Sequence, residues 1–121
     1  MKKIFILFLA LSTFASCQSQ TKDDSKKVDV ATFKKGITSE NIQLIDVRTP
    51  KEYEKGHIEG ATLIDFFDDN FLEELKKLDR NKPVYIYCRS GGRSGKASTM
   101  LVELGFKEIY DLAGGFLAYD K

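Results

Sequence analysis

Four short apolar runs, separated by more polar stretches, dominate the pattern of this chain. They occupy residues 43–47, 61–64, 83–87 and 108–111. Short apolar runs bounded by polar and glycine-containing segments are typical of strands that are buried inside a domain. The intervening segments are long enough to hold helices, so the pattern predicts strands and helices in alternation.

Five segments carry helix signals, and the predicted helices lie at residues 30–35, 50–55, 69–78, 96–104 and 115–119. Asp29 is placed to cap the first of them, which Gly36 ends. Thr49 precedes a proline at the first position of the second helix, and Gly56 stops it. The third is amphipathic, with apolar residues at helical spacing.

Short strands that alternate with helices predict an α/β fold, with a small central parallel sheet flanked by helices on both faces. Residues 28–121 are enough for one such domain. Ligands of parallel sheets bind beyond the carboxyl ends of the strands. Because Cys88 directly follows the strand predicted at residues 83–87, we expect the functional site around this cysteine.

The N-terminal segment has the pattern of an export signal. Lys2 and Lys3 precede an apolar run over residues 4–11, and small residues lead to Cys17, which predicts a signal peptide over residues 1–16. The run is shorter than the about 20 apolar residues that a transmembrane helix needs. The Phe-Ala-Ser-Cys segment resembles a bacterial lipobox, which implies a lipidated Cys17. The alternative is an ordinary signal peptide with an incidental cysteine.

Residues 17–27 would then form the lipidated cysteine and a polar, solvated tether, followed by the domain at residues 28–121. An acyl anchor holds a protein at a membrane surface. We therefore expect a lipid-anchored protein of the bacterial cell envelope, with the domain in the periplasm or at the cell surface.

The charge balance bears on the partners. The chain has 19 basic and 18 acidic residues, and removal of the signal peptide with its two lysines would leave 17 basic residues against 18 acidic ones. No basic stripe interleaved with aromatic residues is present, which argues against nucleic-acid binding. We expect a monomer without a nucleic-acid partner.

The chain has two cysteines, Cys17 and Cys88. Lipidation of Cys17 would leave Cys88 unpaired, and an unpaired thiol in an exported protein is either reactive or a liability. A disulfide between the two is disfavoured, because it would tie the polar tail to the centre of a glycine-rich loop.

Cys88 opens a loop whose residues suit nucleophilic chemistry on an anion. Gly91 and Gly92 permit a tight cradle of backbone N–H groups, while Arg89 and Arg93 add positive charge and hydrogen-bond donors. Such a field, together with the start of a helix, favours thiolate over thiol. This interpretation requires a sulfur that a substrate can reach. The alternative is a buried, inert cysteine before an ordinary glycine turn.

Three segments together resemble the rhodanese family. Residues 44–61 contain an Asp-x-Arg segment followed by Glu-Tyr and Gly-His-Ile-x-Gly-Ala, similar to the N-terminal signature of that family. Residues 88–93 resemble its six-residue active-site loop, and residues 112–116 resemble its Gly-Gly segment near the C-terminus. The three matches occur in the family's order and span most of residues 28–121.

The resemblance implies a sulfurtransferase that needs neither a metal nor an organic cofactor. Cys88 would take sulfane sulfur from a small anionic donor such as thiosulfate, carry it as a persulfide, and pass it to a thiophilic acceptor. That acceptor would be cyanide or a small-molecule or protein thiol. The residues that would form the cradle for the donor and the persulfide are Arg89, Ser90, Gly91, Gly92 and Arg93. For Asp46, Arg48 and His57 we expect structural support.

Other functions of similar loops remain as alternatives. Cysteine-loop phosphatases and arsenate reductases place five residues between Cys and Arg, usually with a His before the Cys. Here Arg93 follows Cys88 after four residues and Tyr87 precedes it, so the loop suits a sulfur atom better than a bulkier phosphoryl group. A non-catalytic binding or sulfur-carrier module is also possible, although such modules usually lack the loop cysteine. A redox role is disfavoured because no Cys-x-x-Cys motif is present.

Overall fold

One parallel sheet organises the computed structural model, which describes residues 25–121. Five strands form this sheet in the order β1-β5-β4-β2-β3, and every neighbouring pair is parallel. The strands are β1 (Ser25–Val28), β2 (Gln43–Asp46), β3 (Thr62–Leu63), β4 (Val84–Tyr87) and β5 (Ile109–Leu112). The predicted α/β fold is confirmed, and the four predicted strands are β2 to β5.

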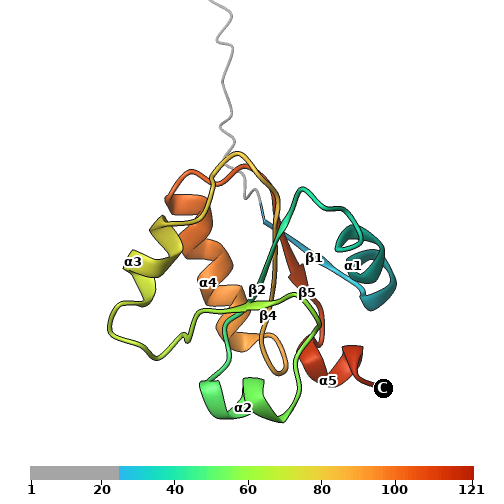
Figure 1. Cartoon of the computed structure of the whole chain (residues 1–121). Helices are drawn as coiled ribbons and strands as arrows, with labels where there is room; N and C mark the ends of the chain where they lie inside the picture. Colours follow the sequence, from blue (N-terminus) through green and yellow to red (C-terminus); the bar gives the residue numbers. More distant parts are fainter. Residues whose placement is uncertain (1–24) are drawn as a thin grey trace, which may run out of the picture.

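Helices cover both faces of the sheet (Figure 1). The helices are α1 (Val30–Gly36), α2 (Pro50–Lys55), α3 (Phe71–Lys76), α4 (Gly92–Glu103) and α5 (Gly115–Tyr119). Buried residues of α3 and α4 belong to one hydrophobic cluster, whereas those of α1 belong to a second one, against which α2 and α5 pack. The sheet is therefore the middle layer of three.

Side chains of β4 alternate between the two hydrophobic clusters. Val84 and Ile86 belong to the cluster shared with α3 and α4, while Tyr85 and Tyr87 contribute to the cluster on the side of α1. Because both faces of the strand are covered, it has no polar face, and its sequence is continuously apolar. This central strand delivers Cys88 to the carboxyl end of the sheet.

Local signals in the sequence account for the starts of α1 and α2. The carboxylate of Asp29 accepts a hydrogen bond from the N–H of Thr32 at 2.8 Å. Thr49 and Glu52 form a reciprocal capping box at the start of α2. Gly36, however, is the last residue of α1 and not a stop signal beyond it, and a Cβ at this position would collide with the ring of Tyr85. Close packing against the sheet is the reason for a glycine here.

Two boundaries differ from the prediction. The tether was expected to continue to residue 27, but Ser25–Val28 pairs with β5 as an edge strand. Lys26 and Lys27 in this strand are exposed, so it carries no apolar pattern and is held by its backbone ladder. In addition, α4 begins at Gly92 instead of residue 96, which makes the end of the loop after Cys88 the first turn of a helix.

The predicted signal peptide, Cys17 and most of the predicted tether lie outside the described residues. Within residues 25–121, no helix has both the length and the apolar character that crossing a membrane requires.

Candidate active site

Cys88 directly follows the carboxyl end of β4 and is the first residue of the loop that leads into α4. The residue is 1% exposed and belongs to the cluster beneath α3 and α4. The backbone N–H of Gly91 donates a hydrogen bond to its Sγ at 3.1 Å. Within the described part of the chain, Cys88 is a free cysteine. The sulfur is therefore less accessible than the reactive interpretation of the sequence required.

Gly91 can direct its N–H at the sulfur because of its backbone conformation. Its φ angle is +122°, in a region that residues with a Cβ rarely adopt. Gly92, in contrast, has a negative φ and is the first residue of α4. The side chains of Arg89 and Ser90 are exposed. Of the predicted cradle, Gly91 thus contributes the amide that contacts the sulfur, and ligand binding by the other four residues stays a prediction.

The start of α5 holds the loop from the other side. The N–H of Phe116 donates to the carbonyl oxygen of Cys88 at 2.8 Å, and the N–H of Leu117 donates to that of Arg89 at 3.1 Å. Gly115 lies so close to these two carbonyl groups that a Cβ would overlap them, and its φ is +62°. The Gly-Gly segment is therefore part of the site. From the sequence, this segment is expected only as part of the resemblance over residues 112–116, without a role in the site.

Arg93 is engaged by a partner that the sequence analysis did not identify. Its guanidinium makes two hydrogen bonds with the carboxylate of Glu52 on α2, at 2.8 and 3.0 Å. These bonds raise the pKa of Arg93, to which an electrostatic interaction with Cys88 also contributes. The positive charge of Arg93 is close enough to interact with Cys88. Two of its N–H donors, which were expected to bind the substrate anion, already bind Glu52. A role of Arg93 as an anion ligand stays a prediction.

Glu52→Gln is expected to make the free energy of unfolding less dependent on pH in the acidic range. The hydrogen bonds from Arg93 lower the pKa of Glu52 from 4.5 to about 2. A lowered pKa stabilises the fold above pH 4.5, and this stabilisation disappears as the pH falls towards about 2. Glutamine retains the capping box but lacks the charge, so at neutral pH we expect a loss of about 1 kcal/mol.

Urea unfolding of both proteins between neutral and acidic pH measures this effect. The difference between wild type and Glu52→Gln should shrink as the carboxylate is protonated. Glu54→Gln removes an exposed carboxylate from the same helix and is the matched control. Parallel curves for wild type and Glu52→Gln across the acidic range would contradict the assigned ion pair.

Asp46 and Arg48 form a buried ion pair beside the loop. Their side chains are 0% and 5% exposed, and Arg48 Nη2 lies 2.8 Å from Asp46 Oδ2. The hydroxyl of Tyr87 donates to the same Asp46 oxygen at 2.6 Å, while Arg48 donates to the carbonyl of Gly56 at 2.7 Å. Burial, together with the bond to Asp46, raises the pKa of Tyr87. The pair thus connects β2, β4 and the end of α2, as structural support would require, although that role stays a prediction.

His57 interacts with α2. Its ring stacks on that of Tyr53 with 3.6 Å between centroids, and its Nδ1 lies 2.9 Å from the Tyr53 carbonyl oxygen. Tyr53 in turn donates from its hydroxyl to the carbonyl of Ala61 at 2.7 Å. These contacts are of the kind that a supporting residue makes. The supporting role of His57 stays a prediction.

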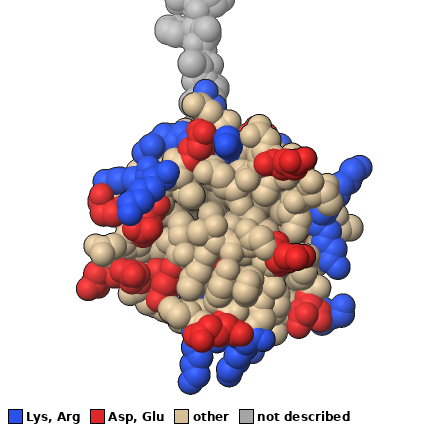
Figure 2. Space-filling view, viewed as in Figure 1, with Lys and Arg blue, Asp and Glu red and all other residues tan. Residues whose placement is uncertain are grey.

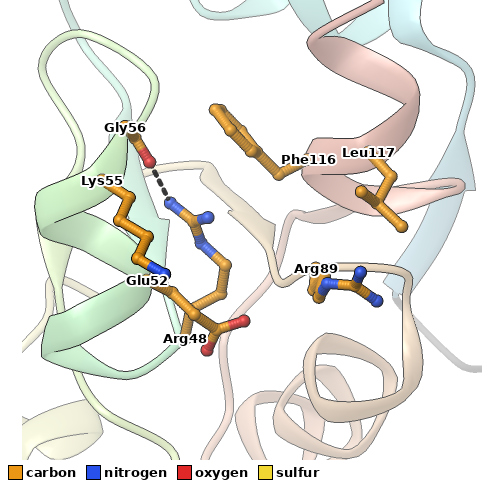
Figure 3. Close-up of a pocket in the computed structure, with 7 residues that line it drawn as sticks. All are labelled: Arg48, Glu52, Lys55, Gly56, Arg89, Phe116 and Leu117. Carbon is orange, nitrogen blue, oxygen red and sulfur yellow. Dashed lines mark hydrogen bonds between the residues drawn. The ribbon is translucent and has the colours of Figure 1, made fainter.

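A pocket of about 240 Å³ opens next to the loop, between α2 on one side and the loop and α5 on the other (Figure 3). Its lining consists of Arg48, Glu52, Lys55, Gly56, Arg89, Phe116 and Leu117. Its basic residues are Arg48, which is paired with Asp46, and Lys55 and Arg89, while the acidic Glu52 is paired with Arg93. Phe116 and Leu117 add an apolar wall. Cys88 does not line the pocket, but its neighbour Arg89 does. The pocket is therefore suited to a small anion held beside the loop.

Behind the sulfur lies a polar pair that the sequence analysis missed. The thiol of Cys88 donates to the hydroxyl oxygen of Ser94 at 3.4 Å, and that hydroxyl donates to Oδ1 of Asp111 at 2.6 Å. Ser94 is 0% exposed and Asp111 is 3% exposed. The sequence predicts Asp111 only as the end of a strand over residues 108–111 and assigns no role to Ser94. An acidic residue in an otherwise apolar strand was the available signal.

Comparison with known families identifies the domain. Residues 29–121 match the rhodanese-like domain family. Among curated proteins, the chain is 46% identical over 74 residues to the uncharacterized protein YqhL of Bacillus subtilis, covering 61% of this chain and 57% of that protein. It is 37% identical over 103 residues to the tRNA uridine(34) hydroxylase of Cytophaga hutchinsonii, covering 82% of this chain but only 33% of the hydroxylase.

A third relative is comparable in length to this domain. The thiosulfate sulfurtransferase GlpE of Pseudoalteromonas translucida is 30% identical over 95 residues, which cover 78% of this chain and 89% of GlpE. Among solved structures, a rhodanese-like domain protein from Staphylococcus aureus has a TM-score of 0.69 and 30% identity, with 78% of this chain and 90% of that one covered. A rhodanese-related protein from Thermoplasma volcanium has a TM-score of 0.70 and 28% identity, with the same coverage of both chains.

Proposed function

The chain belongs to the rhodanese-like domain family, and on that premise we propose that it is a sulfurtransferase. Cys88 takes sulfane sulfur from a small anionic donor such as thiosulfate and carries it as a persulfide to cyanide or to a thiol. The observation that carries this proposal is a single thiol at the end of β4 with the Gly91 N–H directed at its sulfur. The similarity to GlpE over 89% of that protein supports the same class of reaction.

The transfer takes place in two displacement steps. The Cys88 thiolate attacks the outer sulfur of thiosulfate, a new S–S bond forms, and the S–S bond of the donor breaks as sulfite leaves with the electron pair. The acceptor then attacks the outer sulfur of the persulfide, and Cys88 leaves as thiolate. The Gly91 amide, 3.1 Å from Sγ, stabilises the negative charge on the sulfur that both steps require.

The pocket beside the loop supplies a site for the anionic end of the donor. Lys55 and Arg89 provide positive charge on opposite sides of it (Figure 3). Sulfite is the leaving group, so positive charge near its oxygens stabilises the negative charge that accumulates as the bond breaks. Phe116 and Leu117 give the pocket one apolar wall, and charge interactions beside apolar groups are stronger than in bulk water.

The low exposure of Cys88 restricts what reaches its sulfur. At 1% exposure, the sulfur is open only to a small reagent, or to a larger one once the exposed residues of the loop move aside. A sulfane sulfur atom satisfies the first condition. A phosphoryl group is bulkier, and Arg93, which would bind it in a cysteine-loop phosphatase, is held by Glu52. Sulfur transfer is therefore favoured over phosphoryl transfer.

The similarity to tRNA uridine(34) hydroxylases does not extend this proposal to RNA. The chain spans about a third of those proteins. On the face shown in Figure 2, acidic and basic side chains alternate around an uncharged centre, whereas a phosphate backbone is bound by clustered positive charge. A small-molecule or protein thiol is the better-supported acceptor.

We further propose that Cys17 is lipidated and that the tether holds the domain at a membrane of the cell envelope. Support comes from the charged start, the short apolar run and the lipobox-like segment at the N-terminus. One experiment tests both proposals: mass spectrometry of the protein purified from cells and then mixed with thiosulfate.

The expected result is the mass of one added sulfur atom on the peptide that contains Cys88, and its loss after cyanide is added. The N-terminal peptide should begin at Cys17 and carry acyl chains. If the Cys88 peptide keeps its original mass while thiosulfate is consumed, the persulfide mechanism is wrong. An N-terminal peptide without acyl chains would refute the anchor and leave the transferase proposal intact.

A further inference from the structure

The structure raises the question of how Cys88 loses its proton. Cys88 is 1% exposed, so a water molecule has little access to its thiol to act as the base. Asp111 lies one hydroxyl group away. Loss of the thiol proton to solvent would place a second negative charge in this buried region while the first remains on Asp111, and burying charge is costly.

We propose that the Cys88 thiol transfers its proton to the Asp111 carboxylate through the Ser94 hydroxyl. The hydrogen bonds already run in this direction, from Sγ to Ser94 Oγ at 3.4 Å and from Ser94 Oγ to Asp111 Oδ1 at 2.6 Å. The Ser94 hydroxyl has two acceptors within reach, the Gly91 carbonyl oxygen at 3.4 Å and Asp111 Oδ1 at 2.6 Å. The much shorter contact directs its single proton at Asp111, so a lone pair of its oxygen faces the thiol. Ser94 contacts the reacting atom, and Asp111 acts through Ser94.

The step conserves atoms and charge. The S–H bond of Cys88 breaks and its proton joins Ser94 Oγ, while the original hydroxyl proton of Ser94 moves to Asp111 Oδ1. The products are a thiolate and a neutral carboxylic acid, so the buried region has one negative charge before and after the transfer. Ser94 now donates to the thiolate, together with the Gly91 amide at 3.1 Å. No solvent molecule is needed.

The surroundings of Asp111 support its role as proton acceptor. Burial raises the pKa of Asp111. The hydrogen bond from Ser94 and the positive charge of Lys27 act in the opposite direction but are smaller effects. Lys27 is the register partner of Asp111 on β1, Ile86 faces it on β4, and Gly95 approaches it from α4. On the sulfur side, the charge of Arg93 interacts with Cys88. A carboxylate that is desolvated in this way binds a proton more readily than an exposed one.

The relay predicts a distinctive pH profile for the reactivity of the thiol. The thiolate–acid pair holds as many protons as the thiol–carboxylate pair, so its population does not change with pH as long as one proton is shared. The alkylation rate of Cys88 with iodoacetamide should therefore reach a plateau in the mildly acidic range. A thiol that loses its proton to solvent instead reacts about tenfold faster for each pH unit up to its pKa.

Asp111→Asn and Ser94→Ala test the relay. Asparagine can still accept the hydrogen bond from Ser94 but does not take up a proton, and alanine removes the connection. Asp111→Asn should lose the plateau and react about tenfold more slowly for each unit of falling pH. Ser94→Ala keeps both titrating groups, so it should keep a plateau, but at a lower alkylation rate, because the thiolate loses the hydroxyl that donates to it. If Asp111 acted only through its charge, Asp111→Asn would react faster than wild type throughout this range, because removal of a nearby negative charge lowers the pKa of a thiol.

Ser98→Ala is the matched control. Ser98 is a second buried serine of α4, 2% exposed, and its hydroxyl has no hydrogen-bond partner among the described residues. Its removal should preserve the plateau. Thermal unfolding of each variant identifies any that do not fold, and the plateau rate of Ser94→Ala carries the test if Asp111→Asn is one of them. A wild-type profile without a plateau, or a plateau of unchanged rate in Ser94→Ala, would overturn the relay.

The relay rests on the proposed function only in that Cys88 is the reactive residue. A plateau that depends on Ser94 and Asp111, in a protein that forms no persulfide with thiosulfate, would support the relay and refute the sulfurtransferase proposal. If the protein forms a persulfide but its alkylation profile has no plateau, the sulfurtransferase proposal is supported and the relay is refuted. A wild-type thiol that resists iodoacetamide at every pH would overturn both.

Discussion

Replacement of Cys88 by serine is expected to reduce the transfer of sulfur from thiosulfate to cyanide by at least about 10³-fold, the scale at which loss of a nucleophile acts. A serine hydroxyl does not form the equivalent of a persulfide under these conditions. The fold should be retained, because Oγ replaces Sγ at almost the same size and can still interact with Gly91 and Ser94. Initial rates of thiocyanate formation, measured with equal amounts of folded protein, give the comparison.

Two controls make this result specific. Thermal unfolding of Cys88→Ser should match that of wild type within a few degrees. Cys17→Ser, which removes the other cysteine, should leave the turnover of thiosulfate unchanged because Cys17 precedes the domain. Full turnover by Cys88→Ser would show that the thiol is not the carrier of sulfur and would remove the basis of the proposed function.

Gly115→Ala is expected to destabilise the domain by about 2–5 kcal/mol and to lower the turnover of thiosulfate strongly. A Cβ in the left-handed conformation costs about 1–2 kcal/mol, and the φ of Gly115 is +62°. The Cβ would also overlap the carbonyl groups of Cys88 and Arg89, and relief of such overpacking typically costs about 1–3 kcal/mol. For a domain of this size, the expected shift in unfolding temperature is roughly 10–25 °C.

The effect on turnover follows from the hydrogen bonds that the substitution displaces. The first amides of α5 bind the carbonyl groups of Cys88 and Arg89, so a shift of α5 releases the loop on that side. Gly60→Ala is the matched control, since its φ is +89° and no heavy atom lies within 4 Å of a Cβ placed there. It should show the conformational cost of about 1–2 kcal/mol and unchanged turnover. Equal destabilisation by both substitutions would contradict the close approach at Gly115.

The sequence predicted the parts of the site that depend on neighbouring residues. The strand before Cys88, the glycine loop after it and the helix start at Thr49 and Pro50 are all local patterns, and the structure contains them. Gly91 is a clear case. Only its backbone freedom allows the loop to turn its amide towards the sulfur, and that freedom is readable from the residue type alone.

Partners that are distant in the sequence were not predictable in this way. Glu52 was interpreted as part of a motif, and Arg93 as an anion ligand, because nothing local shows that these residues are ion-paired across 41 positions. Asp111 was assigned to a strand, and its hydrogen bond to Ser94 spans 17 positions. The edge strand β1 was missed for a related reason, since its backbone pairing with β5 leaves no apolar pattern in its side chains.

The amino-acid sequence by itself determined the alternation of β2 to β5 with the five helices, the parallel sheet that this order requires, and the place of Cys88 at the end of a strand. These features follow from hydrophobic periodicity and from the backbone preferences of glycine and proline, which act over a few residues. The tertiary structure alone decided how deeply the sulfur is buried, which charge compensates Arg93, and that Ser94 and Asp111 lie behind the thiol. Burial and pairing depend on which side chains packing brings together, and only the assembled sheet with its two layers of helices brings these residues into contact.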